Sequence, residues 1–399
     1  MNNGQLAAPT NMNWVKATGL SVGAIILGSV LAMQAFTNVL ANDQPALAAS
    51  VSPLNGFALE RVALNRLKNQ EDGSLTPLVK KVLAKEPMSP SAWAILALAQ
   101  QDGAKKDAIL LAASKLNRRT LLLQSNLLLL YASRDDFFNS IGVLNQILSV
   151  YPEQKGTMFP ILIQALKDER SIPEFVQALG KSPSWSDSFL RAASADSDTL
   201  PNLTQVRMGL FDKVAVERDT DKAIIGALVK AGRIETAVAL YRRISAPSAG
   251  GPFGSAGKFQ EVDWSTTMPP FDWQLKDDPG MRAQVGGKPE RLDFFVKSGK
   301  ADTIAERLIV SPRAPFDLKI VHDMIPVAQL NDVEIRLQCA KSKETLVKLS
   351  FSKSPSSYSV ANIPENCGII NISIFARAWS DKPDLEGEVR SITILPKPI

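Results

Sequence analysis

The 399-residue sequence is poor in the side chains that most often carry chemistry, because it contains one histidine, His322, and two cysteines, Cys339 and Cys367. A single histidine excludes metal sites with two or more histidine ligands, and any histidine-dependent triad must use His322. His322 follows an apolar run, so we expect a strand-end histidine with a local hydrogen bond. The cysteines are too far apart for a local redox or zinc motif. We therefore expect no catalytic residue, no metal and no cofactor.

Charge is absent from residues 17–36, which read ATGLSVGAIILGSVLAMQAF. Twenty residues at about 1.5 Å each are long enough to cross a bilayer core of roughly 30 Å. We therefore predict a short tail, 1–16, and a transmembrane helix over 17–36. Lys16 is the only charged side chain before the helix, and positive charge favours the cytoplasm. This predicts a single pass through the inner membrane, with the bulk of the chain exported to the periplasm.

A cleaved signal peptide is the alternative interpretation of this segment. Two small-residue patterns suit cleavage, namely Val39-Leu40-Ala41 and Ala46-Leu47-Ala48. The apolar run exceeds the usual signal-peptide core of about 7–15 residues, which favours a retained anchor and a juxtamembrane linker over 37–56. Both alternatives deliver the chain to an oxidising space, where Cys339 and Cys367 are expected to form a disulfide. Two buried free thiols are the other interpretation of the pair.

Residues 57–246 show helical periodicity. One clear stripe of apolar residues consists of Phe137, Ile141, Leu144 and Leu148, which follows the spacing of an amphipathic helix. Ser89-Pro90 is typical of a helix start. Helix stops recur after intervals of 30, 35 and 31 residues, at Pro87, Asn117, Pro152 and Pro183. A period near 34 residues indicates repeated helix–turn–helix units.

Two stretches resemble tetratricopeptide repeats (TPRs): LLLLYASRDDFFNSIGVLNQILSVYP at 127–152 and IIGALVKAGRIETAVALYRRISAP at 224–247. In the second, the turn Gly232, Ala237 and Pro247 match the family pattern. In the first, Ser133-Arg134 stands where the turn glycine is usual. The resemblance implies a TPR-like α-solenoid over 57–246 that binds protein partners.

Residues 247–259, rich in Gly, Pro, Ala and Ser, are predicted to be a flexible linker. Beyond them the apolar period changes to two, over 292–296, 305–310, 316–321, 333–337, 346–351, 369–375 and 389–394. Seven or more short strands predict a jelly-roll-like β-sandwich over 260–399. A Trp-bearing opening strand, a mid-domain cysteine strand and the final EGEVRSITIL resemble carbohydrate-binding-module sandwiches in fold style.

Two groups in the sandwich retain a functional interpretation. Trp264, Phe271 and Trp273 are candidate glycan contacts because flat aromatic faces stack on sugar rings, although large aromatics also fill sandwich cores. An acidic stretch suits either a calcium loop or a solvated hairpin, and it contains Asp381, Asp384, Glu386 and Glu388.

The sequence thus predicts a multidomain protein, α then β, that resembles membrane-anchored bacterial envelope proteins of the TPR-like kind. We expect a non-enzymatic scaffold or adaptor that binds protein partners through its solenoid, in the setting of cell-surface polysaccharide production or secretion. The alternative is a glycan-binding module in which the sandwich holds polysaccharide and the solenoid is a spacer. We expect no nucleic-acid partner.

Overall fold

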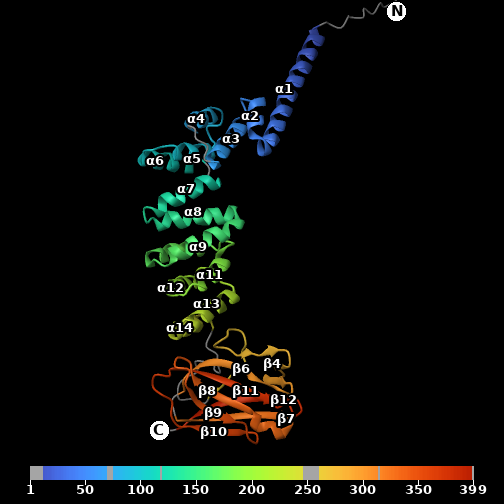
Figure 1. The fold of residues 1–399 in the computed structure, drawn as a ribbon, viewed down its shortest axis with the longest axis vertical. Coiled ribbons are helices and arrows are strands. Elements are labelled where there is room, and N and C mark those ends of the chain that lie inside the picture. The colour runs from blue at the N-terminus through green and yellow to red at the C-terminus, as the bar shows by residue number, and fades with distance from the viewer. Residues whose placement is uncertain (1–11, 70–74, 117–118, 246–259, 313–314, 398–399) are drawn as a thin grey trace, which may run out of the picture. The chain divides into compact units, whose positions relative to one another are not determined.

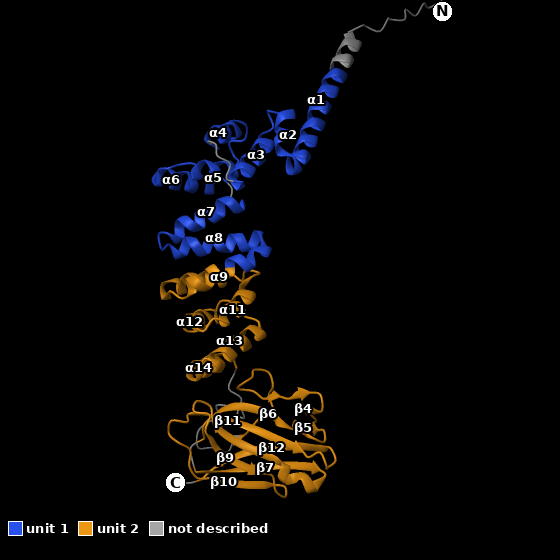
Figure 2. Cartoon of the chain, viewed as in Figure 1, with its two compact units in different colours: residues 1–158 blue, residues 159–399 orange. Residues whose placement is uncertain are grey.

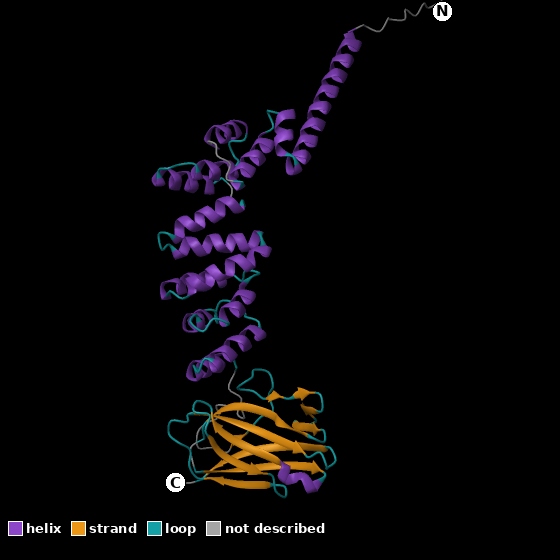
Figure 3. Cartoon of the chain, in the orientation of Figure 1, coloured by secondary structure: helices purple, strands orange, loops and turns teal. Residues whose placement is uncertain are grey.

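The computed structural model describes residues 12–69, 75–116, 119–245, 260–312 and 315–397. Helices fill the described chain up to residue 245, and antiparallel strands fill it from residue 260 onward (Figures 1 and 3). This confirms the predicted order of a helical part followed by a two-sheet β domain. The predicted linker 247–259 lies outside the described residues. The chain forms two compact units, residues 1–158 and 159–399 (Figure 2).

Four helices of the first unit begin at a side-chain cap. The side chains of Asn55, Ser89, Asp102 and Asp136 each accept a hydrogen bond from a backbone N–H of the first helical turn, which satisfies donors that the helix itself leaves unpaired. The elements are α1 (Met12–Asp43), α2 (Pro45–Val51), α3 (Gly56–Lys68), α4 (Leu75–Lys85), α5 (Pro90–Leu98), α6 (Gly103–Ser114), α7 (Leu121–Ala132), α8 (Phe137–Val150) and η1 (Pro152–Gln154). The predicted start at Ser89-Pro90 is confirmed.

The helix α1 is the one described helix that is long and apolar enough to span a membrane, from Leu20 to Asp43. Its side chains are exposed from Leu20 to Phe36 and become partly buried from Thr37 onward. Residues 37–56, expected as a linker, are instead mostly helical, because α1 continues to Asp43 and α2 follows it directly.

A small core joins the end of α1 to α2 and α3. Ala41, Ala48 and Ala58, one from each helix, are buried together. Beside them the Asn55 side-chain amide donates to Thr37 Oγ1 at 2.9 Å and to Asn38 Oδ1 at 2.8 Å. Small residues allow the helices to approach closely, so α1 is folded into the helical region and does not merely precede it.

Helices continue through the start of the second unit: α9 (Lys155–Leu166), η2 (Glu169–Ser171), α10 (Ile172–Leu179), α11 (Ser186–Ser194), α12 (Leu200–Gly209), α13 (Arg218–Lys230) and α14 (Ile234–Ile244). Neighbouring helices pack in overlapping pairs, with α10 on α12, α11 on α13 and α13 on α14. The predicted turn glycine, Gly232, lies between α13 and α14 with a φ of +74°. A positive φ is readily available only to glycine, which explains its place in this turn.

The β domain contains two antiparallel sheets. The larger has the order β10-β7-β12-β5-β4-β3, with β1 also paired to β12, and the smaller has the order β2-β6-β11-β8-β9. The strands are β1 (Gln260–Glu261), β2 (Gln274–Leu275), β3 (Asp277–Asp278), β4 (Met281–Gly286), β5 (Arg291–Val296), β6 (Lys300–Val310), β7 (Phe316–Ile325), β8 (Val333–Cys339), β9 (Thr345–Ser350), β10 (Ser356–Val360), β11 (Ile369–Ala378) and β12 (Leu385–Pro396). A short helix, η3 (Val327–Asp332), connects β7 to β8.

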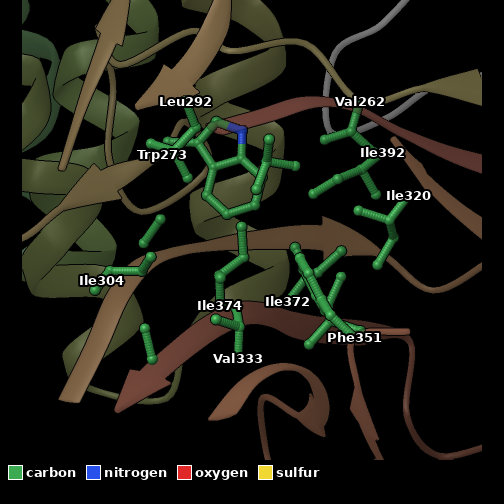
Figure 4. Close-up of a cluster of buried hydrophobic side chains, with 14 of the residues drawn as sticks. Val262, Trp273, Leu292, Ile304, Ile320, Val333, Phe351, Ile372, Ile374 and Ile392 are labelled. Carbon is green, nitrogen blue, oxygen red and sulfur yellow. The ribbon is translucent and has the colours of Figure 1, made fainter. Parts of the chain in front are cut away.

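The two sheets share one apolar core. Inward side chains from both sheets, among them Leu292, Ile320, Ile372 and Ile392, belong to one buried cluster with Trp273 (Figure 4). In β5 the buried residues alternate with partly exposed ones, as a strand with one buried face requires. The seven predicted strands all coincide with observed strands, from β5 to β9 and at β11 and β12.

Candidate functional site

The candidate glycan-contacting aromatics are buried in the sandwich core. Trp264, Phe271 and Trp273 are 6%, 0% and 1% exposed. The two indole rings stack with centroids 5.2 Å apart, and the Trp273 ring nitrogen donates to the Asp263 carbonyl at 2.8 Å. None of the three presents a face to solvent on which a sugar could stack. The glycan interpretation of these residues is therefore replaced by core packing, the alternative for large aromatics.

Asp272, in the same segment, joins the sandwich to α14. Its Oδ1 accepts from the Tyr241 hydroxyl at 2.8 Å, and its Oδ2 accepts from Ser265 Oγ, Thr267 Oγ1 and the Met268 N–H, each at 2.8 Å. Burial opposes the charge on Asp272, but these hydrogen bonds outweigh it and lower the pKa of the carboxyl. Burial and the neighbouring carboxylate raise the pKa of Tyr241. Both groups thus hold a structural contact in fixed ionisation states.

Arg307 supports this segment from β6. Its guanidinium donates to the Phe271 carbonyl at 3.0 Å and, at 2.8 and 2.7 Å, to the Asp263 carbonyl and Oδ1. The residue is almost completely buried. These bonds pair a buried cation with the backbone of the opening segment, so this cluster fixes the segment against the sheet.

The structure joins Cys339 and Cys367 in a disulfide, with Cα atoms 5.5 Å apart. Cys339 ends β8 and lies opposite Ile370 of β11, and Cys367 lies in the loop before that strand. The link therefore closes the loop containing β9 and β10 against the smaller sheet. Its role is structural, because the chain lacks the local redox spacing that would indicate exchange chemistry.

His322 lies inside β7, which continues to Ile325, so the expectation of a strand-end position was wrong. Its Nε2 is 2.8 Å from Ser356 Oγ, the spacing of a serine–histidine dyad. However, His322 is 3% and Ser356 0% exposed. The centroid of the His322 ring lies 4.6 Å from that of the Phe351 ring. Among the described residues, Nδ1 has no hydrogen-bond partner and so no orienting carboxylate. Burial lowers the pKa of His322, and the pair is a core contact.

The acidic stretch is divided between a turn and a strand. Asp384 precedes β12 and accepts a hydrogen bond from the Ser298 N–H at 2.7 Å, whereas Glu386 and Glu388 lie within β12. Glu388 pairs with Arg291, with Nε 2.9 Å from the carboxylate. Within the part of the chain that the structure describes, no group of three or more metal-ligating side chains is present. The stretch connects β11 of the smaller sheet to β12 of the larger sheet, and these strands do not pair, so the hairpin interpretation was also wrong.

An open groove of about 430 Å³ lies on the outer face of the larger sheet. Four neighbouring strands, β4, β5, β12 and β7, provide its lining in that order. Its polar side chains are Arg282, Gln284, Asp293, Asp323, Glu386 and Glu388, and its outward apolar ones are Phe295 and Ile325. One aromatic ring among amide, carboxylate and guanidinium groups suits a ligand with many hydroxyl groups. Sequence reasoning missed the groove because its residues lie up to about a hundred positions apart.

The helical region leaves large apolar side chains exposed on one hairpin. Leu129 of α7 and Phe138 of α8 are 69% and 57% exposed. These two helices pack on one another, and Asp135, with a φ of +53°, makes the turn between them. Large apolar side chains left exposed on adjacent elements often mark a contact surface for another protein.

Neither the protein-family models nor the curated proteins include a match to this chain.

Proposed function

We propose that this chain is a single-pass, membrane-anchored adaptor without catalytic activity, whose TPR-like helical region binds a protein partner. Its N-terminus lies in the cytoplasm and the remainder in the periplasm, beside the inner membrane. The process it serves is the production or secretion of cell-surface polysaccharide.

The packing of α1 supports a retained anchor. Cleavage after Ala41 or Ala48 would remove one or both of these core residues, and it would also remove the Thr37 hydroxyl to which Asn55 donates. The buried Asn55 amide would then lose partners, which costs free energy in a folded protein. Retaining α1 leaves this core and its hydrogen bonds complete.

The observation that carries the adaptor proposal is the exposed pair Leu129 and Phe138 on the α7–α8 hairpin. Stacked helical hairpins bury their core between neighbours and leave a continuous side surface, which suits extended partners. Burying both side chains against a partner would remove an exposed apolar area that the isolated hairpin cannot cover.

Crosslinking in intact membranes followed by affinity purification tests this proposal. The variant Leu129→Ser/Phe138→Ser should lose the crosslinked partner, while Met88→Ser, which also replaces an exposed apolar side chain of the first unit, should keep it. Equal membrane levels of both variants exclude an effect on insertion. Equal recovery of the same partner with both variants contradicts the proposal.

The second candidate function is saccharide binding by the β domain, and the groove on the larger sheet is the observation that favours it. Phe295 offers a partly exposed ring from β5, and Arg282 and Glu386 flank it from β4 and β12. This version of the glycan hypothesis uses none of the three buried aromatics.

Isothermal titration of the full-length protein with surface polysaccharide fragments separates the two candidates. Saturable heat that disappears in Phe295→Ala but persists in Trp379→Ala, an exposed aromatic outside the groove, favours saccharide binding. No heat with the wild type leaves the adaptor as the function of the chain.

A further inference from the structure

The turn between α2 and α3, residues 52–55, lies beside the part of α1 where the apolar run ends. Asn55 donates to Thr37 Oγ1 and Asn38 Oδ1, so the turn is level with residues 37 and 38 of α1. The seven residues of α2 have a length of about 10 Å, and α1 advances about 9 Å from Thr37 to Asp43. The chain therefore reverses after Asp43, and α2 returns it to the level of Thr37.

This level coincides with the end of the predicted span. The predicted span ends at Phe36, and from Thr37 onward α1 is partly buried against α2 and α3. A helix that crosses the bilayer over this run therefore places the 52–55 turn at the membrane surface on the exported side.

The side chains around this turn have an orientation unusual for a water-exposed surface. The polar groups of Thr37 and Asn55 point inward and are buried, whereas Leu54 is 73% exposed. Leu47 and Val51 are also exposed, and their i, i+4 spacing places them on one face of α2. The surface formed by Leu47, Val51 and Leu54 is called the elbow patch below.

The charge distribution around the elbow patch matches a lipid environment. Between Lys16 and Glu60 the sequence carries one charged side chain, Asp43. Asp43 ends α1, about 9 Å along the helix from Thr37 and so away from the 52–55 turn. From the following segment the Glu86 side chain lies against Gly56, next to the turn. The elbow patch can therefore lie in the interfacial region but not deep in the hydrocarbon, where burying that charge would be costly.

We propose that the elbow patch is embedded in the interfacial region of the bilayer, with Leu54 and Val51 in contact with lipid on the exported face. This inference rests on the proposed membrane-spanning role of α1. It adds a second membrane contact, so that the membrane holds the first helices of the exported part at a defined depth.

Site-specific labelling of the full-length protein in nanodiscs of phosphatidylethanolamine and phosphatidylglycerol tests the inference. Because Cys339 and Cys367 form a disulfide, a newly introduced cysteine is the free thiol available for a polarity-sensitive fluorophore. The test variants are Leu54→Cys and Val51→Cys. Met88→Cys is the aqueous control, and Gly28→Cys, where an added Cβ meets no neighbour, is the control within the span.

At Leu54 and Val51 we expect blue-shifted emission, loss of fluorescence with lipid-borne quenchers, and less quenching by aqueous iodide than at Met88. The inference is overturned if iodide quenches the labels at Leu54 and Val51 as strongly as the Met88 label while lipid-borne quenchers still reach the Gly28 label. That result would leave the proposed anchor intact. A Gly28 label that lipid-borne quenchers do not reach overturns the spanning role of α1, and with it this inference.

Discussion

At the scale of single residues, the second unit contains a buried ion pair between adjacent helices. Arg207 of α12 donates to Asp221 of α13 through Nε at 2.6 Å and through a terminal nitrogen at 2.9 Å, and both side chains are almost completely buried. The guanidinium also lies 4.1 Å from the centroid of the Phe211 ring. Such a pair costs desolvation when it forms, but removing one partner leaves an uncompensated charge.

The substitution Asp221→Ala should therefore lower the free energy of unfolding of the second unit by about 3–5 kcal/mol. The double variant Arg207→Met/Asp221→Leu should recover most of this loss, because apolar side chains can fill the same space without an unpaired charge. Urea unfolding monitored by fluorescence measures both. A double variant no more stable than Asp221→Ala would contradict the assignment of the loss to an unpaired arginine.

His322 predicts a pH dependence of the β domain. Burial lowers the pKa of His322 below its ordinary 6.5, so at mildly acidic pH the unfolded chain binds a proton that the folded chain does not. Stability should therefore fall as the pH drops below about 6.5 and should show no contribution from this group at pH 8. The variant His322→Gln, which can keep a hydrogen bond to Ser356, should show a smaller fall. If the unfolding midpoints of the wild type and His322→Gln fall in parallel with pH, His322 is not the source of the pH dependence.

At the scale of elements, the positions of the strands were largely predictable, and the contacts between distant segments were not. Alternation identifies β5 and β8 because each buries one face against a single core. β10, with the polar sequence SSYSV, was missed because it lies at the edge of the larger sheet and buries few apolar side chains. Trp264 and Trp273 show the same limit, since no local pattern distinguishes a ring inside the core from one on the surface.

The turns of two helical hairpins illustrate how much the local sequence can predict. Gly232 occupies the left-handed position expected of a turn glycine, and in the α7–α8 hairpin Asp135 takes the corresponding conformation without a glycine. Aspartate tolerates a positive φ better than most residues. The α7–α8 pair therefore forms its hairpin although Ser133-Arg134 stands where a turn glycine was expected.

Gly387 of β12 is a glycine that the sandwich requires. It lies opposite Phe294 of β5 and Met324 of β7, and a Cβ added here would come within 2.5 Å of Phe294 Cζ and would overlap Met324 Sδ. Gly387→Ala should therefore destabilise the β domain by about 1–3 kcal/mol through overpacking. Gly368→Ala, where an added Cβ meets no atom within 4 Å, is the matched control. Equal unfolding midpoints for the two variants would show that the core accommodates the methyl group.

At the scale of the whole molecule, the compact units do not follow the change in composition. The division falls at residues 158 and 159, within α9, although the sequence changes from helical to strand periodicity a hundred residues later. Within the second unit, the ring centroids of Tyr241 of α14 and Phe271 lie 5.1 Å apart, and the Tyr241 hydroxyl donates a hydrogen bond to Asp272. Periodicity reports secondary structure, whereas compactness depends on such long-range contacts, so the two need not change at the same residue.

The proposed membrane topology predicts on which side of the membrane each end of the chain lies. A periplasm-active reporter fused after Ile399 should be active, the same reporter fused before Met1 should be inactive, and the mature N-terminus should precede Trp14. Lys16 and the long uncharged run are the physical reasons. N-terminal sequencing of the mature protein provides the second measurement. A mature chain that begins at Asn42 or Ala49 would replace the anchor with a cleaved signal.

The shared core of α1, α2 and α3 links the folded helices to the thickness of the bilayer. In the proposed topology the span 17–36 has a helical length of about 30 Å, which matches a hydrocarbon core of about 30 Å. An apolar helix longer than the bilayer is thick accommodates the excess by tilting. Because Ala41, Ala48 and Ala58 pack the three helices together, α2 and α3 must tilt with α1. A thinner membrane would therefore present the helices that follow the anchor at a steeper inclination, with no change in their sequence.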